Sequence, residues 1–169
     1  DGTLITTLVS NTSLFDSSGT FRGVLAAVTD ITERKRVEEE LREGRERFRS
    51  IFDNTPLGVA IVASDFRFRM VNRRFTDMLQ YSGDELLNKT FADITHPDHV
   101  TGDVTETRRV FSGERETYNT EKRYIRKDGS ILWAALTVTS VKDKDGSVLY
   151  AIALIEDISE RKQAEMVLT

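Results

Sequence analysis

The stretch that decides the fold is residues 128–162, DGSILWAALTVTSVKDKDGSVLYAIALIEDISERK. Residues 131–141 alternate and are rich in Val, Thr and Trp, which indicates a strand. An Asp-Gly turn at 143–146 and an apolar run at 148–155 follow, so a second strand returns along the first. Charged residues then replace the apolar ones. The stretch therefore predicts a hairpin that leads directly into a helix.

The same pattern opens the chain. Shifting the sequence by 127 positions aligns residues 1–42 with 128–169 without a gap, and 14 of the 42 aligned residues are identical. The pair Asp1-Gly2 falls on Asp128-Gly129, so a turn is expected at both places. Self-similarity at a fixed spacing marks a repeated structural unit. Both ends of the chain are thus predicted to be the back end of one module type.

The junction between strand and helix also repeats. Residues 30–33, DITE, and 157–160, DISE, each place an Asp before the helix and a Glu three residues later. This spacing is typical of a reciprocal N-cap. Capping alone accounts for the Asp. We also expect the cap to tie the last strand to the helix, so that distortion of the sheet moves the helix. The expected signal-coupling residues are Asp30, Asp157, Ser159 and Glu160.

The segment between the repeats begins with a strongly charged helix. Of residues 33–49, 13 of 17 are charged with the signs interleaved, which is typical of a solvated helix face. An apolar seam with heptad spacing nevertheless runs through it, and Gly44 weakens it. The sequence predicts a dimerising helix whose seam consists of Val37, Leu41, Phe48 and Ile51.

The middle of the chain completes one module. Two strands are expected at 58–63 and 66–71, followed by a helix that Asn72 caps and a short helix at 83–87. A longer helix begins at Pro97 and ends at Gly113. Three further strands are expected at 117–126, 131–141 and 148–157. Strands and helices segregated in this way predict an α+β fold, with short helices on one face of an antiparallel sheet.

Several motifs resemble a PAS domain with a PAC-type C-terminal motif, as found in bacterial and archaeal multidomain sensory proteins such as sensor histidine kinases. They are RFRSIFDNTPLG at 47–58, VNRRF at 71–75, YSGDEL at 81–86, THPD at 95–98, YIRKDGS at 124–130 and EDISERK at 156–162. The resemblance covers about residues 45–160. It implies the PAS fold: a five-stranded antiparallel sheet of order 2-1-5-4-3, with a pocket between the sheet and the helices.

The resemblance also implies a domain organisation. Residues 1–30 resemble the last two strands of a preceding PAS domain, and 31–52 a helical linker of the kind found in sensor histidine kinases and cyclic-di-nucleotide enzymes. A complete PAS domain is expected at 53–157 and the start of an outgoing signalling helix at 158–169. Because the chain opens with Asp1 rather than Met, we expect a piece of a longer cytoplasmic protein whose anchor, where one exists, lies elsewhere.

The apolar residues that are expected to face the interior of the module can form either an ordinary hydrophobic core or the wall of a ligand pocket. Thr107, Arg108, Tyr118 and Tyr124 are candidates for polar contacts. The expected pocket residues are Val59, Ile61, Phe75, Met78, Phe91, Val104, Thr107, Arg108, Phe111, Tyr118, Trp133 and Ile152. Two functions stay open: a sensor that binds an unidentified small ligand, and a ligand-free relay and dimerisation module whose cavity Phe and Met side chains fill.

Other functions are disfavoured. The chain has no cysteine, which excludes thiolate chemistry and cysteine-adduct flavin photochemistry. His96 and His99 lack a third clustered ligand, so a metal site and haem are both disfavoured. We expect His96 and Asp98 to be loop-capping and turn residues instead. The net charge of -4 argues against a nucleic-acid partner, and no apolar run is long enough for direct membrane insertion. No catalytic constellation is recognisable, so the chain is not expected to be an enzyme.

The expected partners are a second copy of the chain, through the flanking helices, and the adjacent PAS and output domains of the parent protein. A lone two-stranded hairpin is marginal in water. We therefore expect the hairpin at 3–29 to pack on a neighbouring chain or on the intact domain, with Leu4, Leu8 and Val28 among the side chains that it covers.

Overall fold

The structure is a computed structural model that describes residues 2–169. Asp1, and with it half of the turn predicted at Asp1-Gly2, lies outside the described residues. The chain divides into two compact units, one up to Ser50 and one from Ile51 onward.

The first unit contains an antiparallel hairpin of β1 (Thr7–Phe15) and β2 (Phe21–Asp30), followed by α1 (Thr32–Asn54), which continues into the second unit. Asp16 closes the hairpin turn: its Oδ1 accepts hydrogen bonds from the backbone N–H groups of Ser18 and Thr20, both at 3.0 Å. Gly19 supplies the left-handed conformation, with φ of 80°. The large apolar side chains of this hairpin are exposed.

The sequence repeat is a repeat of structure. In the second unit, β6 (Ile131–Lys142) and β7 (Val148–Asp157) pair with Ala134 opposite Asp157, just as Thr7 lies opposite Asp30 in the hairpin. The turn between β6 and β7 repeats as well, because the Oδ1 of Asp143 accepts from the N–H groups of the residues two and four positions later. Residues 127 positions apart thus occupy equivalent places.

The second unit contains a five-stranded antiparallel sheet of order β4-β3-β7-β6-β5. Counted within the module, this is the predicted order 2-1-5-4-3, and the α+β fold class is confirmed. The remaining strands are β3 (Gly58–Val62), β4 (Phe68–Val71) and β5 (Thr117–Ile125). The helices are α2 (Arg73–Leu79), α3 (Gly83–Leu87), the 3-10 helix η1 (Phe91–Ile94), α4 (Pro97–Phe111) and α5 (Ser159–Val167).

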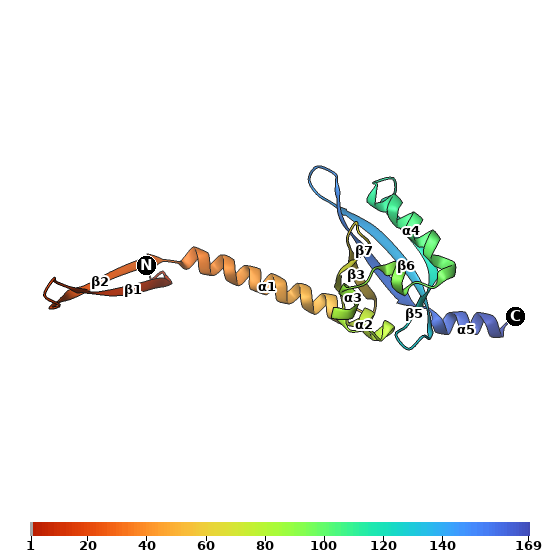
Figure 1. Ribbon diagram of the computed structural model, residues 1–169, viewed down its shortest axis with the longest axis horizontal. Helices are drawn as coiled ribbons and strands as arrows, with labels where there is room; N and C mark the ends of the chain where they lie inside the picture. The colour runs from red at the N-terminus through yellow and green to blue at the C-terminus, as the bar shows by residue number, and fades with distance from the viewer. Residues whose placement is uncertain (1) are drawn as a thin grey trace. The chain divides into compact units, whose positions relative to one another are not determined.

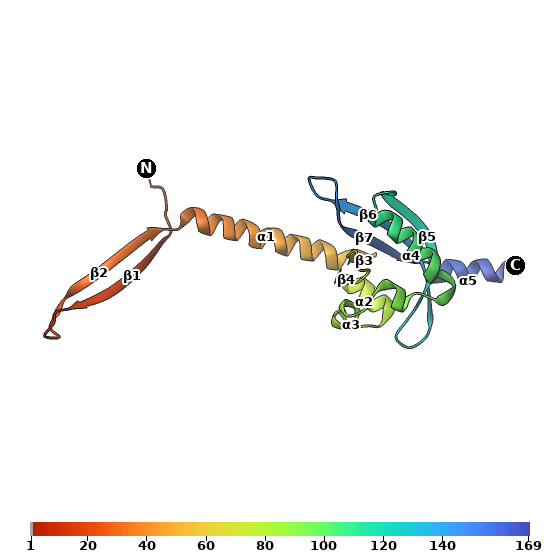
Figure 2. The same ribbon diagram turned by 45° about the horizontal axis from the view of Figure 1, so that its top comes forward.

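Short helices cover one face of this sheet (Figure 1), where α4 lies along the strands at the β5–β6 side. Figure 2 shows α2 and α3 together beside β3 and β4. The helices α2, α3, η1 and α4 each begin at a side-chain cap that the sequence supplies. The side chain of Asn72 accepts from Phe75 N–H, and the Nδ1 of His96 accepts from Asp98 N–H with Pro97 in the first turn. His96 therefore has the predicted capping role.

Asn72 is fully buried and joins three segments of the second unit. Its Oδ1 also accepts from Val59 N–H at 2.8 Å, and its Nδ2 donates to the carbonyls of Phe52 at 2.7 Å and Leu57 at 3.0 Å. The end of α1, the start of β3 and the first turn of α2 thus share one amide group.

The reciprocal cap predicted at the strand-to-helix junction does not form at α5. Asp157 still belongs to β7, and the N-cap position is held by Ile158, without a side-chain cap. Instead, the Oδ1 of Asp157 accepts from Ser159 N–H at 2.9 Å, as Asp30 does from Thr32 N–H. The prediction was wrong because the last strand extends one residue further than an N-cap at Asp157 requires. Glu160 is exposed.

The apolar seam of α1 is exposed, with Val37, Leu41, Phe48 and Ile51 between 49% and 68% accessible. Among the described residues, no helix is both long and apolar enough to cross a membrane.

Candidate functional site

The core of the second unit encloses a small cavity between α4 and the inner face of the sheet. Its volume is about 20 Å³, which is room for about one water molecule. Most of the residues in its wall are apolar, and they include Ala151 and Ala153 of β7. The lining residues are Val62, Phe68, Phe91, Asp103, Thr107, Tyr118, Lys122, Tyr124, Leu136, Val138, Ala151, Ala153 and Ile155.

A buried ion pair lies in this wall. Lys122 of β5 is 1% exposed and Asp103 of α4 is 5% exposed, and the Nζ of Lys122 contacts Oδ2 of Asp103. Nζ also donates to Oγ1 of Thr95 at 3.0 Å. Buried charges cost free energy unless they are paired and hydrogen-bonded, and this pair satisfies both conditions.

Two aromatic rings complete the surroundings of the ammonium group. Nζ lies 4.2 Å from the ring centre of Tyr124 and 5.5 Å from that of Phe91. The negative faces of aromatic rings attract cations, most strongly where water is excluded. A carboxylate, a hydroxyl and two ring faces therefore hold the Lys122 ammonium in the core.

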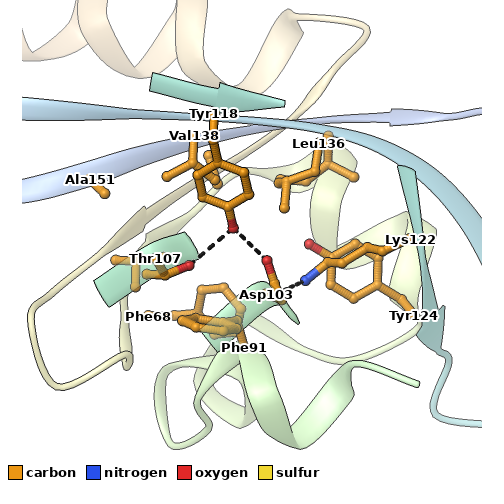
Figure 3. Close-up of a pocket in the computed structure, with 13 residues that line it drawn as sticks. Phe68, Phe91, Asp103, Thr107, Tyr118, Lys122, Tyr124, Leu136, Val138 and Ala151 are labelled. Atoms are coloured by element: carbon orange, nitrogen blue, oxygen red, sulfur yellow. Dashed lines mark hydrogen bonds and ion pairs between the residues drawn. The ribbon is translucent and has the colours of Figure 1, made fainter. Parts of the chain in front are cut away.

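A chain of hydroxyl groups orients the carboxylate from the other side (Figure 3). Tyr118 of β5 donates to Oδ1 of Asp103 at 2.5 Å, and its oxygen lies 3.0 Å from Oγ1 of Thr107. Since the phenol has one proton, Thr107 donates to Tyr118. We call Thr95, Asp103, Thr107, Tyr118 and Lys122 the polar cluster.

The electrostatics follow from burial. Burial lowers the pKa of Lys122, while the Asp103 carboxylate opposes that shift. Burial, with Asp103 as a smaller contribution, raises the pKa of Tyr118 and also that of Tyr124. Both phenols therefore keep their protons at neutral pH, and Tyr118 remains a hydrogen-bond donor to Asp103.

A second, open space adjoins the cavity. The groove between α4 and β5 has a volume of about 290 Å³, and most of the residues that line it are polar or charged. The residues lining it are Asp98, His99, Gly102, Asp103, Glu106, Arg115, Tyr118, Asn119, Thr120 and Lys122. Asp103, Tyr118 and Lys122 line both spaces. These three members of the polar cluster thus form the partition between the groove and the core cavity.

His99 stands at the edge of this groove and also contacts the outer face of the sheet. Its Nε2 accepts from Nε of Arg123 at 3.1 Å, and its ring packs edge-on against Trp133 at 5.9 Å. Burial, and then the Arg123 charge, lower the pKa of His99. The neutral His99 ring can accept the hydrogen bond from Arg123, and this contact holds it against the sheet. Among residues 2–169, no three His, Cys, Asp or Glu side chains are grouped to hold a metal ion.

The outer face of the sheet carries the exit helix. Lys162 of α5 pairs with Glu121 of β5 at 2.5 Å, and its Nζ lies 5.3 Å from the ring centre of Trp133. The backbone N–H of Trp133 donates to Oγ of Ser159 at 3.2 Å. Ile158, between β7 and α5, is buried with 5% of its surface exposed, which holds the start of α5 against the domain. The first turns of α5 are therefore docked on β5 and β6.

Three of the twelve predicted pocket residues, Phe91, Thr107 and Tyr118, line the cavity, as does Tyr124. Phe75 and Met78 are buried in the core but do not line the cavity, and Val104 and Phe111 are half-buried against that core. Arg108 is exposed and stacks over the ring of Phe66.

The remaining four predicted residues, Val59, Ile61, Trp133 and Ile152, lie on the opposite face of the sheet, so this prediction was wrong. Side chains alternate along a strand, and the inward positions of these strands are the buried neighbours. The inner face instead has small buried residues such as Ala60, Ala134 and Ala153, which belong to the same core as the paired rings of Phe68 and Phe75.

Asp103 and Lys122 were missed, although the sequence contains a signal for both. In β5, Lys122 lies an even number of residues from Tyr118 and Tyr124, so all three face the same side of the sheet. In α4, Asp103 lies four residues before Thr107 and therefore on the same side of the helix. A charged residue on each of two inward-facing stripes points to a buried pair. Charged types are seldom fully buried, and this is why composition alone did not suggest it.

Comparisons with known proteins agree with this architecture. The sequence profile described as the PAS fold matches residues 52–163. A probable diguanylate cyclase, DgcE of Escherichia coli (strain K12), is 36% identical over 129 residues, which are 76% of this chain and 12% of that protein. The sensor protein TdiS of Thauera aromatica is 32% identical over 115 residues, which are 68% of this chain and 21% of that protein.

A solved structure gives the same result for the fold. The PAS domain of an HTR-like protein from Haloarcula marismortui matches with a TM-score of 0.60 and 25% sequence identity. The match covers 73% of this chain and 99% of that chain. The chain therefore spans nearly all of an isolated domain of this kind, but only a small part of the two signalling proteins.

Proposed function

The chain belongs to the PAS fold family, and from this premise we propose that it senses a small molecule in the cavity beside the polar cluster and passes the change to α5. A PAS domain is a sensory module of signalling proteins and is not itself catalytic; the activities named for its relatives belong to other domains of those proteins. The observation that carries the proposal is the hydrogen-bonded charge pair inside an otherwise apolar core.

Such a cluster suits recognition rather than stability. Replacing a buried ion pair by apolar residues is often neutral or stabilising, so a buried pair adds little to the folding free energy. The buried pair instead provides hydrogen-bond donors and acceptors in fixed directions, which a ligand that enters the apolar cavity can use. The groove between α4 and β5 supplies an entry route that meets the cluster first.

The proposed output runs along β5 to α5. Tyr118 and Lys122 of β5 contact Asp103, while Glu121 of the same strand pairs with Lys162 of α5. A ligand that moves β5 relative to α4 changes the docking surface of α5. We include Asp157 and Ser159 in this route, because their hydrogen bonds join β7, β6 and the first turn of α5.

The proposal extends to the organisation of the chain. Residues 1–30 are proposed to be the end of a preceding PAS domain, 31–52 the linker, 53–157 the intact domain and 158–169 the start of the signalling helix. The matching strand register of the two hairpins supports the first assignment. The exposed seam of α1 supports a homodimer through this linker. Adjacent domains of a longer protein are the proposed receivers.

The cavity volume of about 20 Å³ favours a second candidate, a relay without a ligand. A thermal-shift screen of small molecules on the whole chain, combined with Ala153→Val, distinguishes the two. Ala153 lines the cavity, so the added methyl groups fill it. Ala135→Val on the outer face is the matched control. A sensor predicts a compound that raises the melting temperature of wild type and of Ala135→Val, but not of Ala153→Val.

A relay predicts that no compound shifts the melting temperature. It also predicts that Ala153→Val leaves the docking of α5 unchanged, because the variant then only fills a void. The fluorescence of Trp133, the single tryptophan of the chain, reports that docking.

A further inference from the structure

The polar cluster also indicates what class of ligand the cavity accepts. We propose that the ligand is a short-chain monocarboxylate, whose carboxylate takes the place of the Asp103 carboxylate on Lys122 and Tyr118 while Asp103 turns into the groove. This inference rests on the proposed sensory function of the cavity. Its argument has three steps: the donors, the charge balance and the available volume.

The donors already form a carboxylate-binding site. Nζ of Lys122 and the hydroxyl of Tyr118 both point at one carboxylate, that of Asp103, and Thr107 holds Tyr118 in this orientation. Charge-assisted hydrogen bonds from an ammonium and a phenol favour a carboxylate over a neutral acceptor. The chain's own aspartate therefore occupies a site that an external carboxylate also fits.

The charge balance selects an anion over other ligands. Leaving the Lys122 ammonium unpaired in the core is strongly unfavourable. A neutral or cationic ligand that displaces Asp103 leaves it unpaired, whereas a monocarboxylate keeps the core neutral as Asp103 leaves. The Asp103 side chain has space to move into, because it already lines the groove of about 290 Å³. Beside it, Gly102 also lines that groove, and a Cβ added there meets no atom within 4 Å.

The volume of the cavity limits the size of the ligand. The side chain of Asp103 beyond its Cα has the size of an acetate ion, and the adjoining cavity adds room for about one water molecule. The two together fit a carboxylate of about two to four carbons. The apolar wall beyond the cluster, with Leu136, Val138 and Ala151, suits an alkyl tail.

Calorimetry and thermal shift on the whole chain test this with butyrate, 1-butanol and n-butylammonium at constant ionic strength. Butyrate is expected to raise the melting temperature and to bind at least about tenfold more tightly than butanol, since only butyrate satisfies Lys122. Lys122→Met is expected to abolish this preference. Gly102→Ala, which adds one methyl group to the groove wall, is expected to slow association without destabilising the fold.

Asp103→Ala provides chemical rescue. It removes the carboxylate and leaves a formate-sized hole that joins the cavity beside an unpaired Lys122, so the variant is expected to be destabilised and to be restored by acetate or propionate, but not by chloride. Removing the internal competitor is expected to tighten propionate binding about tenfold or more. Asp98→Ala, also in the groove wall but outside the cavity, is the matched control and is expected to show no rescue. If Asp103→Ala does not fold, the wild-type titrations decide.

The outcomes separate the two proposals. Binding of butanol or butylammonium with no preference for butyrate overturns the ligand class but supports a sensory cavity. Butyrate binding that Lys122→Met leaves unchanged overturns the proposed anchor. No binding by any of the three, with no rescue of Asp103→Ala, overturns the ligand class and favours the ligand-free relay.

Discussion

Lys122 and Glu121 are consecutive residues of β5, and their side chains lie on opposite faces of the sheet. Lys122 pairs with Asp103 in the core, and Glu121 pairs with Lys162 of α5. Because successive side chains of a strand alternate, a shift or twist of β5 moves both contacts at once. One strand therefore connects the candidate input site with the exit helix.

The buried pair makes the first prediction. Lys122→Met leaves the Asp103 carboxylate in the core without its counter-ion and is expected to lower the free energy of unfolding by about 3–5 kcal/mol. Asp103→Leu combined with Lys122→Met removes both charges and is expected to recover most of that loss. Urea unfolding of the three proteins gives the values. A double variant as unstable as the single one would show that the charge pair is not the cause.

The outer contact makes the second prediction. Glu121 and its two partners on α5 are partly exposed, so Glu121→Gln is expected to cost less than about 1 kcal/mol. It is nevertheless expected to loosen α5 and to change the fluorescence of Trp133, whose ring lies near Lys162. Glu156→Gln, an exposed carboxylate of β7, is the control. Equal fluorescence changes in both variants would argue against a specific role of Glu121.

Asn72 makes the third prediction. Asn72→Ala removes four hydrogen bonds at once: two that Asn72 donates to partly buried carbonyls, and two that it accepts from the N–H groups of Val59 and Phe75. The expected loss is about 3 kcal/mol or more, since each unsatisfied buried group costs about 1–3 kcal/mol. Asn88→Ala, which removes one exposed hydrogen bond to Asp84, is expected to cost about 0.5–1.5 kcal/mol. Similar midpoints of chemical unfolding for the two variants would contradict this role.

Glu85 makes a prediction about pH. Hydrogen bonds from Lys127, and then from Ser82 N–H, lower the pKa of Glu85 to about 2. The folded-state pKa of Glu85 lies below its unfolded value of about 4.5. The ionised carboxylate therefore stabilises the fold above pH 4.5, and this stabilisation is lost as the pH falls toward 2. NMR titration of the Glu85 carboxyl measures this pKa. Lys127→Met is expected to raise this pKa, and Lys144→Met is expected to leave it unchanged. A pKa near 4.5 in wild type would refute the contact.

The seam of α1 predicts the oligomeric state. Leu41→Glu places a charge in the exposed apolar stripe and is expected to weaken a dimer that forms through this helix. Glu43→Gln, off the seam, is expected to have no effect. Sedimentation over a range of concentrations measures both. A wild-type chain that stays monomeric at high concentration would contradict the proposal.

Much of the fold could be predicted because local and long-range signals agree. The Asp-Gly turns, Asn72 before α2 and Pro97 at the start of α4 each mark a boundary that the structure has. The sheet order followed from a resemblance, since the pairing of β3 with β7 leaves no local trace in the sequence. The start of α5 was misplaced by one residue, because an Asp accepts the same N–H from the end of a strand as from an N-cap.

The site was harder to predict, and for a physical reason. Strands β3, β6 and β7 are apolar on both faces, so alternation alone does not tell which side is inside. Trp133 was predicted to line the pocket, whereas in the structure it contacts the first turns of α5. The pair of Asp103 and Lys122 joins residues 19 positions apart, and only the packing of α4 on β5 shows that each charge has a partner.

Hydrogen exchange of the α5 amides, compared between wild type and the Asp103→Leu/Lys122→Met variant, tests the link between core and exit helix most directly. The variant removes the charge pair and leaves Glu121, Trp133 and α5 unaltered. Coupling through β5 predicts faster exchange of the α5 amides while those of β3 and β4 keep their wild-type rates. Wild-type exchange at α5, in a variant whose α4 and β5 amides have changed, would contradict it.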